Sequence, residues 1–225
     1  MSRLEDVFFQ CDAETLARRL LGKVLRRHWR GLWLSARIIE TEAYRLEDKG
    51  SHASLGYTHA RRALFMAGGT IYMYYARGGD SLNLGAEGQG NAVLIKSAHP
   101  WLDHMSGPDA LAVMQSLNPQ ANGQPRAPEK LCAGQTLLCR ALALKVPDWN
   151  ARGFDAAEFY VDDVGVRLPR IIRTTRLGIP PGRDEHLPYR YVDPDYATYC
   201  TRNPLRRGQR ETDHYTWVAG DAQEL

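Results

Sequence analysis

Strand-like segments follow one another directly in the first hundred residues, and tight turns rather than helices join most of them. These segments are Lys23–Arg30, Leu32–Tyr44, Thr70–Arg77, Ser81–Leu84 and Ala92–Ser97. Tight turns join antiparallel strands, whereas parallel strands need long crossover connections. The sequence therefore predicts an α+β fold, in which a curved, largely antiparallel sheet has helices packed around it.

Helical character appears before the first strand and again in the middle of the chain. The predicted helices are Ala13–Leu21, Pro108–Leu117 and Pro128–Leu144, and the last two begin with a proline that suits a first helical turn. Val164–Ile172 and Tyr189–Val192 return to strand character. With no repeat and no break in composition, we expect one domain over residues 1–200. Residues 201–225 are expected to form a polar, arginine-rich tail that is partly disordered.

Length and composition exclude several classes of protein. A chain of 225 residues can bury a core without disulfides or metals. No apolar run approaches the ~20 residues of a membrane helix, and the N-terminus does not resemble a signal peptide. Four scattered cysteines without a C-x-x-C pair indicate neither a disulfide framework nor a zinc site. We expect a reduced intracellular protein with no metal, no cofactor and no membrane contact.

The formal net charge is only +3, but arginine supplies most of the positive charge and is clustered. The clusters are Arg18-Arg19, Arg26-Arg27-Arg30, Arg61-Arg62, Arg170-Arg173-Arg176 and Arg202-Arg206-Arg207-Arg210. Guanidinium groups match phosphate geometry, so the clusters fit a nucleic-acid surface. A solvated arginine-rich surface would have the same composition, and charge alone leaves both interpretations open.

Two carboxylates and a phenol share one face of the second strand. Side chains alternate along a strand, so Glu40, Glu42 and Tyr44 point to the same side. Taken alone, this pattern is most often a solvated face. The functional alternative is a carboxylate in a pocket, where it acts as a base or nucleophile.

An aromatic strand and a long polar loop supply the other candidates. Tyr72 and Tyr74 share a strand face, which fits either a core stripe or a platform on which bases stack. The loop Arg45–Arg62 is long enough to be functional. It contains His52, with no second histidine at metal-ligand spacing. Gly88 and Gly90 are followed by a strand rather than a helix, so we interpret them as a turn.

Together these strings resemble the alkyladenine (3-methyladenine) DNA glycosylase family. The resemblance rests on Glu40-Thr41-Glu42-Ala43-Tyr44, His52, Met66-x-x-Gly69-Thr70-x-Tyr72-x-Tyr74, Asn83 and Val93-Leu94-Ile95 in this order. Weaker matches continue to about residue 200. The resemblance implies a single mixed domain with a curved antiparallel sheet and a hairpin that enters the DNA minor groove. It also implies a monofunctional enzyme that cleaves the base–sugar bond with water.

The resemblance also implies roles for individual residues. Glu42 matches the carboxylate that activates the water, and Tyr44 and His52 match groups on one face of a flipped base. Tyr74 matches the aromatic on the other face, Asn83 matches the residue that screens the purine edge, and Leu94 matches an apolar pocket wall. Such a cage would attract a positively charged alkylated adenine by cation–π and stacking forces. The target atom is inaccessible in a stacked duplex, so the nucleotide must be extruded.

The sequence departs from the family pattern at the hairpin and beside the pocket. The segment from Tyr75 to Asn83 is one residue short, so the residue that wedges into the DNA is either Tyr75 or Arg77. Lys96 replaces an arginine near the pocket, which keeps the charge but loses the bidentate geometry. We expect these three residues to contact DNA.

Two alternatives remain open at this point: a damaged-DNA binding module without catalysis, and an unrelated hydrolase that uses Glu40 and Glu42 as an acid/base pair. The favoured prediction is a base excision repair glycosylase that removes 3-methyladenine and related lesions from double-stranded DNA. We expect it to act as a monomer on the nucleoid of a prokaryotic cytoplasm.

Overall fold

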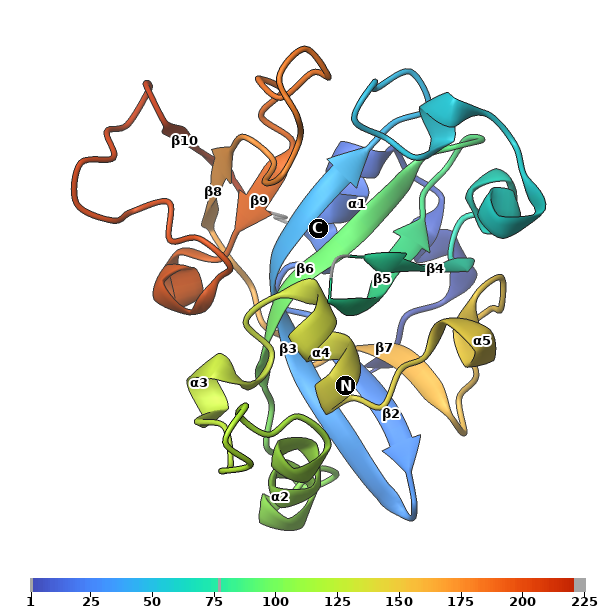
Figure 1. Cartoon of the computed structure of the whole chain (residues 1–225), viewed down its shortest axis with the longest axis vertical. Helices are drawn as coiled ribbons and strands as arrows, with labels where there is room; N and C mark the ends of the chain where they lie inside the picture. The colour runs from blue at the N-terminus through green and yellow to red at the C-terminus, as the bar shows by residue number, and fades with distance from the viewer. Residues whose placement is uncertain (1, 77, 221–225) are drawn as a thin grey trace.

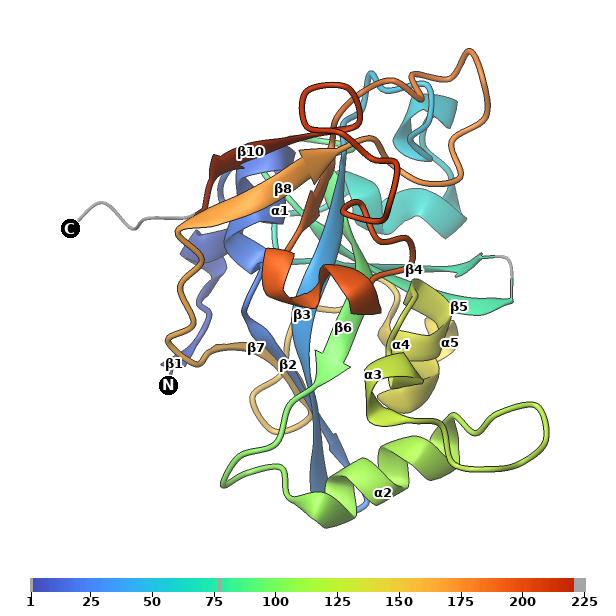
Figure 2. The ribbon, with the colours of Figure 1, turned by 90° about the vertical axis from the view of Figure 1, so that its left-hand side faces the viewer.

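The structure is a computed structural model, and it describes residues 2–76 and 78–220. A branched antiparallel sheet of ten strands organises these residues, and helices cover its faces (Figures 1 and 2). The strands are β1 (Ser2–Arg3), β2 (Val24–Trp29), β3 (Leu32–Tyr44), β4 (Ile71–Ala76), β5 (Gly79–Gly85), β6 (Ala92–Pro100), β7 (Phe159–Asp163), β8 (Arg170–Thr174), β9 (Arg190–Val192) and β10 (Tyr215–Ala219). The predicted α+β class and single domain are confirmed.

Strand β3 is the centre of the sheet because it pairs with three other strands. Strand β6 lies along one edge of β3, from Ala36↔Pro100 to Tyr44↔Ala92. On the other edge, the first half of β3 pairs with β2, and Glu40, Thr41 and Glu42 pair with β9. The β3–β6 register shifts on either side of Glu40, which is a bulge or irregularity. The long strand thus joins two arms of the sheet at the segment that holds the two glutamates.

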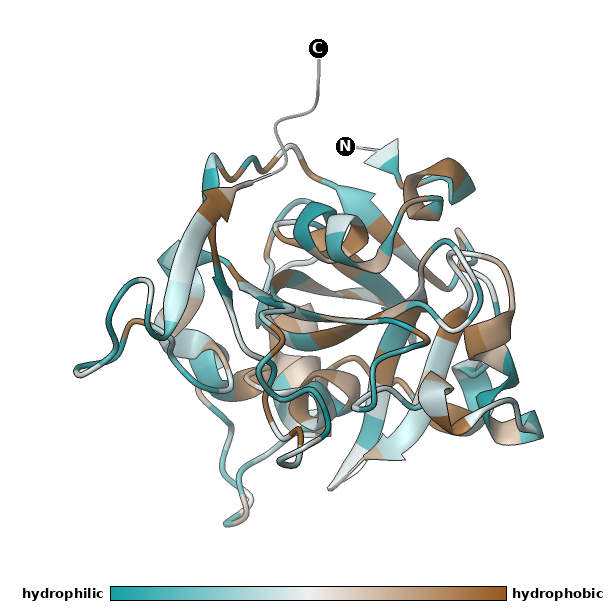
Figure 3. Ribbon diagram, turned by 90° about the horizontal axis from the view of Figure 1, so that it is seen from above, coloured by the Kyte–Doolittle hydropathy of each residue, from teal (hydrophilic) through white to brown (hydrophobic). Residues whose placement is uncertain are grey.

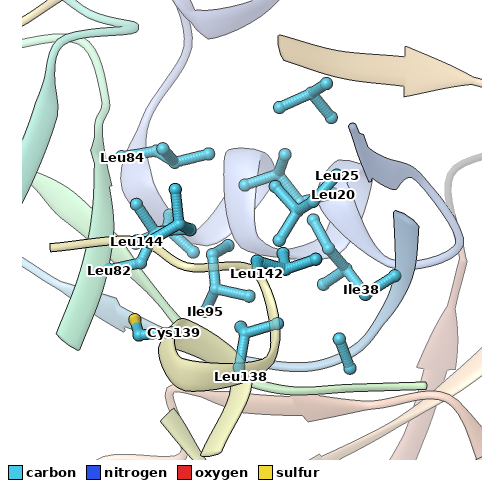
Figure 4. Close-up of a cluster of buried hydrophobic side chains, with 14 of the residues drawn as sticks. Leu20, Leu25, Ile38, Leu82, Leu84, Ile95, Leu138, Cys139, Leu142 and Leu144 are labelled. Carbon is cyan, nitrogen blue, oxygen red and sulfur yellow. The ribbon is translucent and has the colours of Figure 1, made fainter. Parts of the chain in front are cut away.

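Helices pack on the sheet where the sequence places apolar stripes. They are α1 (Ala13–Leu20), α2 (Pro108–Leu117), α3 (Pro128–Leu131), α4 (Gln135–Ala141) and α5 (Val146–Trp149), with 3₁₀ turns at Asp6–Phe9, Ala53–Leu55, His59–Phe65 and Pro194–Tyr199. Asp12 caps α1 by accepting from the amides of Glu14 and Thr15. The main core joins side chains from α1, α4 and the central strands, among them Leu20, Ile38, Leu82, Ile95 and Leu138 (Figure 4). Seen from above, hydrophilic colouring is concentrated on the outer loops (Figure 3).

Three predicted elements differ from the structure. The helix predicted over Pro128–Leu144 is broken at Gly134, whose φ of 132° is not helical. The strand predicted over Val164–Ile172 is wrong in its first part. Gly165 and Pro169 interrupt it, and the observed strands are β7, which ends at Asp163, and β8, which begins at Arg170. Within the tail predicted over residues 201–225, Tyr215–Ala219 forms strand β10, which the sequence did not predict and which pairs with β8, whereas residues 221–225 lie outside the described residues.

Within the described residues, no helix has the length and apolar character that crossing a bilayer requires. None of the four cysteines forms a disulfide. Cys132 and Cys139 are fully buried in the core, and this burial raises the pKa of both thiols far above the usual value, so they stay protonated near neutral pH.

Candidate active site

A cleft of about 670 Å³ lies beside strands β3, β4, β5 and β6. The loops at residues 50–55 and 177–183 also line it. Most predicted site residues line it: Tyr44, His52, Tyr74, Tyr75, Asn83, Leu94 and Lys96. They come from five separate segments of the chain, so the fold brings together what the sequence keeps apart. Arg77 lies outside the described residues. Glu42 does not line the cleft itself but binds three residues that do.

The Glu42 carboxylate has three partners, each of which lines the cleft. The Tyr44 hydroxyl donates to Oε2 at 2.7 Å, and the Leu177 amide donates to Oε1 at 2.9 Å. Lys96 Nζ forms an ion pair with Oε1 at 3.5 Å. The Glu42 side chain is fully buried, whereas 11% of the Lys96 side chain is exposed. The solvated-face interpretation of this strand is therefore wrong, since Glu40 is fully buried as well.

Tyr44 is fixed by an arginine on one side of its ring. The Arg176 guanidinium lies 4.6 Å from the ring centroid. It donates to Asp48 at 2.8 Å and to the Ala43 carbonyl at 3.0 Å, and all of these groups are buried. Burial raises the pKa of the Tyr44 phenol well above its usual value, and the Glu42 carboxylate raises it further. Tyr44 is consequently a permanent hydrogen-bond donor to Glu42 near neutral pH.

Three aromatic groups form one wall of the cleft. Tyr72 and Tyr74 stack at 5.6 Å between centroids, which confirms their shared strand face. The His52 ring contacts the Tyr74 ring at 4.3 Å, and His52 Nδ1 lies 3.0 Å from the Tyr72 hydroxyl. Burial raises the pKa of Tyr72 to about 12. Burial also lowers the pKa of His52, and the charges of Arg61 and Arg183 lower it further.

The expected division of these rings between the two faces of a base needs correction. A base stacked between two rings separates their planes by roughly 7 Å, twice the usual contact distance. The 4.3 Å between His52 and Tyr74 leaves no such space, so both belong to the same wall. Tyr44 and Tyr75 also line the cleft, and of these two Tyr44 is the one that contacts Glu42.

Asn83 and Leu94 lie opposite each other on β5 and β6. Asn83 is 5% exposed, and its Nδ2 donates to the Tyr72 carbonyl at 3.1 Å. Its side-chain oxygen and the second N–H of Nδ2 are therefore the groups that it can offer to a ligand. Leu94 adds an apolar surface beside it. The two residues form a mixed polar and apolar edge of the cleft.

Glu40 belongs to a buried network rather than to the cleft. Its Oε1 accepts from Arg190 Nε at 2.6 Å, and its Oε2 accepts from Ser97 Oγ at 2.5 Å and from the Thr201 amide at 2.9 Å. Both oxygens thus have protein donors. This arrangement argues against the hydrolase alternative, in which Glu40 and Glu42 would act together as acid and base.

Tyr75 lies near the end of β4 and is 68% exposed. The hairpin of β4 and β5 is braced from outside the sheet, because Arg140 Nη2 donates to the Gly78 carbonyl at 2.7 Å. Asp80 in β5 accepts from Lys145 Nζ at 3.2 Å and from the Val146 amide at 2.9 Å. An exposed aromatic on a braced hairpin can reach into a bound molecule without loss of the strand pairing.

Sequence reasoning missed the supports beneath the aromatic groups. Arg176, Asp48 and the Leu177 amide were not among the predicted site residues. The string Arg176-Leu177-Gly178-Ile179 belongs to the weaker matches of the resemblance, and Arg176 also falls in one of the arginine clusters, but neither signal indicates a contact with Tyr44 or Glu42. No pattern in the sequence indicates that Thr201, more than 150 residues from Glu40, donates a hydrogen bond to it.

Comparisons with known proteins agree on one family. The family model described as methylpurine-DNA glycosylase (MPG) matches residues 7–197. A Pseudomonas aeruginosa protein named "Putative 3-methyladenine DNA glycosylase" is 66% identical over 92% of this chain and 86% of its own length. A Pseudomonas syringae pv. tomato protein of the same name is 66% identical over 96% of both chains. The mouse protein "DNA-3-methyladenine glycosylase" is 36% identical over 72% of this chain and 47% of its own length.

Proposed function

Because the chain belongs to the methylpurine-DNA glycosylase family, we propose that its cleft receives an alkylated purine swung out of duplex DNA and that Glu42 directs water at the base–sugar bond. The chain is accordingly a monofunctional DNA-3-methyladenine glycosylase, a hydrolase of N-glycosyl bonds. The observation that carries the proposed mechanism is the position of Glu42, held by Tyr44, Leu177 and Lys96 beneath an aromatic cleft.

The aromatic groups suit a flat and electron-poor base. The base would lie between Tyr44 on one side and the wall of His52 and Tyr74 on the other. Good cation–π contacts contribute about 0.5–2 kcal/mol each to binding of a cation. The lowered pKa of His52 favours a neutral imidazole at neutral pH, which does not repel a positively charged purine such as 3-methyladenine. The Asn83 oxygen and Leu94 would meet the edge of the base.

The chemistry needs one nucleophile and one group that takes its proton. Water attacks C1′ of the deoxyribose while the bond from C1′ to the base nitrogen breaks, and the bonding electrons leave with the base. A cationic alkylated purine departs as a neutral molecule and needs no acid. Glu42 accepts the proton of the water and stabilises the positive charge that develops on the sugar. Lys96 lines the cleft beside Glu42, so we place the water next to this pair.

The decisive experiment compares Glu42→Gln with the unaltered chain on a duplex that carries one 3-methyladenine. We expect release of the free base to fall by about 10²–10⁴-fold, because the general base is lost. Binding to the lesion duplex should remain, since glutamine has the shape of glutamate and its one oxygen can still accept from either Tyr44 or Leu177. The exposed carboxylate variant Glu87→Gln is the matched control and should release base at the original rate.

Two results would count against the proposal. Near-normal base release by Glu42→Gln would remove the carboxylate from the mechanism. Binding to lesion duplex without any base release by the unaltered chain would instead support the module without catalysis.

A further inference from the structure

Residues 201–214 form a segment that is fixed at both ends. At the first end, the Thr201 amide donates to Glu40 and the Arg202 carbonyl accepts from Arg190 Nη2 at 2.5 Å. At the other end, the His214 carbonyl accepts from Thr174 Oγ1 at 2.7 Å, just before β10 pairs with β8. The segment is thus a tethered loop on the sheet, and its path between the two anchors is constrained.

The first anchor lies at the cleft. Thr201 lines the cleft, and its hydroxyl lies 3.0 Å from that of Ser97, the neighbour of Lys96 on β6. From there the loop, red in Figure 1, runs to the side of β8 and β9. The β4–β5 hairpin lies on the other side of β3 and β6 in the same view. The loop and the hairpin therefore flank the cleft from opposite sides.

The loop is positively charged and exposed. Arg202, Arg206, Arg207 and Arg210 are exposed, against two acidic residues, Glu211 and Asp213. Arg210 pairs with Asp213 at 2.8 Å. Within the part of the chain that the structure describes, no carboxylate lies within ion-pair distance of Arg206 or Arg207. Two guanidinium groups thus remain available to an external anion.

We propose that the loop formed by residues 202–210 binds the phosphate backbone of DNA on the side of the cleft opposite the β4–β5 hairpin. The proposal rests on the proposed function for its ligand, duplex DNA. Arginine pairs with phosphate in a bidentate manner, and such contacts set the position of a protein on DNA without reading its sequence. The loop lies beyond residues 7–197, which the family model matches, so the contact is not part of the matched family region.

The tethered loop has a physical advantage over a free arginine-rich tail. A disordered segment loses conformational entropy when it binds, and this cost reduces its affinity. Here the buried Glu40 network and the β8–β10 pairing fix the ends of the loop before DNA arrives. The loop would hold the duplex on one side while the hairpin contacts it on the other, which keeps the lesion over the cleft.

The test measures how binding to an undamaged 25-base-pair duplex depends on salt. The variant Arg206→Gln/Arg207→Gln removes the two unpaired cations from the exposed loop. The matched control, Arg3→Gln/Arg30→Gln, removes two exposed arginines from β1 and the β2–β3 turn, which do not line the cleft. Each phosphate contact contributes about 0.9 to the slope of log K against log salt, so the loop variant should lose about 2 from that slope.

We also expect the Kd of the loop variant to rise about tenfold near 100 mM salt, whereas the control keeps the original slope and Kd. Single-turnover base release at saturating enzyme should stay unchanged in both variants, because neither pair belongs to the cleft. A loop variant with the slope and Kd of the control would overturn the proposal. Failure of the unaltered chain to release base would instead overturn the proposed mechanism. The salt dependence of binding to undamaged duplex would still test the contact between the loop and DNA.

Discussion

At the scale of single residues, Tyr44 combines two tasks that can be separated by experiment. Its ring faces the cleft, and its hydroxyl donates to Glu42. Tyr44→Phe keeps the ring and removes the donor. A hydrogen bond to a charged group is worth about 1.5–3 kcal/mol. We therefore expect the single-turnover rate of base release to fall about 10–100-fold, with little change in the Kd for lesion duplex.

Tyr72→Phe is the matched control for this substitution. It also removes a buried hydroxyl, but that hydroxyl lies beside His52 rather than Glu42. We expect a much smaller loss of rate. Equal rate losses in the two variants would show that the Tyr44–Glu42 hydrogen bond has no special part in catalysis.

His52 leads to a prediction about pH. Burial, followed by Arg61 and Arg183, lowers the pKa of the folded imidazole below the ordinary value of 6.5. The unfolded chain binds the proton first as the pH falls, so the contribution of neutral His52 to stability is present above pH 6.5 and is lost below it. An NMR titration of the His52 ring should give a midpoint below 6.5. Arg183→Gln should raise that midpoint, and Arg30→Gln should leave it unchanged. A midpoint at or above 6.5 would contradict the prediction.

At the scale of elements, the β4–β5 hairpin presents Tyr75 on a braced support. If Tyr75 wedges into the duplex, Tyr75→Ala should weaken binding to lesion duplex severalfold and slow base release. The reason is that no side chain then fills the space that the extruded nucleotide leaves between its stacked neighbours. Release from a single-stranded substrate should change little, since no stacked neighbour has to be replaced. The control Val7→Ala truncates an apolar side chain that is also exposed, at 76%, on a 3₁₀ turn that does not line the cleft. Parallel losses on single and double strands would show that Tyr75 acts in the cleft instead.

The elements also show how far a local pattern determines a fold. The antiparallel sheet was predictable because β2–β3 and β4–β5–β6 are joined by short glycine turns, and alternation placed Tyr72 and Tyr74 on one face. The break of the helix at Gly134 could not be predicted, because the apolar spacing of Pro128–Leu144 continues through this residue. Strand β10 has aromatic and β-branched residues, but the polar residues on either side of it favour a loop. Its pairing with β8 is a long-range contact that the local sequence does not indicate.

The candidate site divides in the same way. The resemblance, rather than the local patterns alone, singled out Glu42, Tyr44, His52 and Tyr74. Three of them line one cleft, and Glu42 contacts that cleft through Tyr44. The residues that hold these side chains in place could not be predicted. Arg176 reaches Tyr44 from more than 130 residues away, and the Leu177 amide that holds Glu42 is a backbone group that any residue would supply. Only the packing of the 176–183 loop on β3 shows these contacts.

At the scale of the whole molecule, charges are buried as pairs that fasten distant segments to the sheet. Arg26 pairs with Asp103 and Asp162, Arg176 pairs with Asp48, and Glu40 pairs with Arg190. Each pair links segments that are well separated in the sequence. Breaking a buried pair is costly because the remaining charge loses its partner in a region without water. The pairs therefore fix where the loops around the cleft can lie.

The Glu40–Arg190 pair gives the sharpest test of this arrangement. Glu40→Gln leaves the Arg190 guanidinium buried without its charge partner, so the free energy of unfolding should fall by about 3–5 kcal/mol in denaturant titrations. The exposed pair of Arg152 and Glu158, 3.2 Å apart, gives the control Glu158→Gln, which should cost less than about 1 kcal/mol. Because Glu40 also holds the Thr201 amide, the loop at residues 202–210 should become more sensitive to trypsin in Glu40→Gln than in the control. Equal stability losses with unchanged cleavage would mean that Glu40 does not fasten this segment to the cleft.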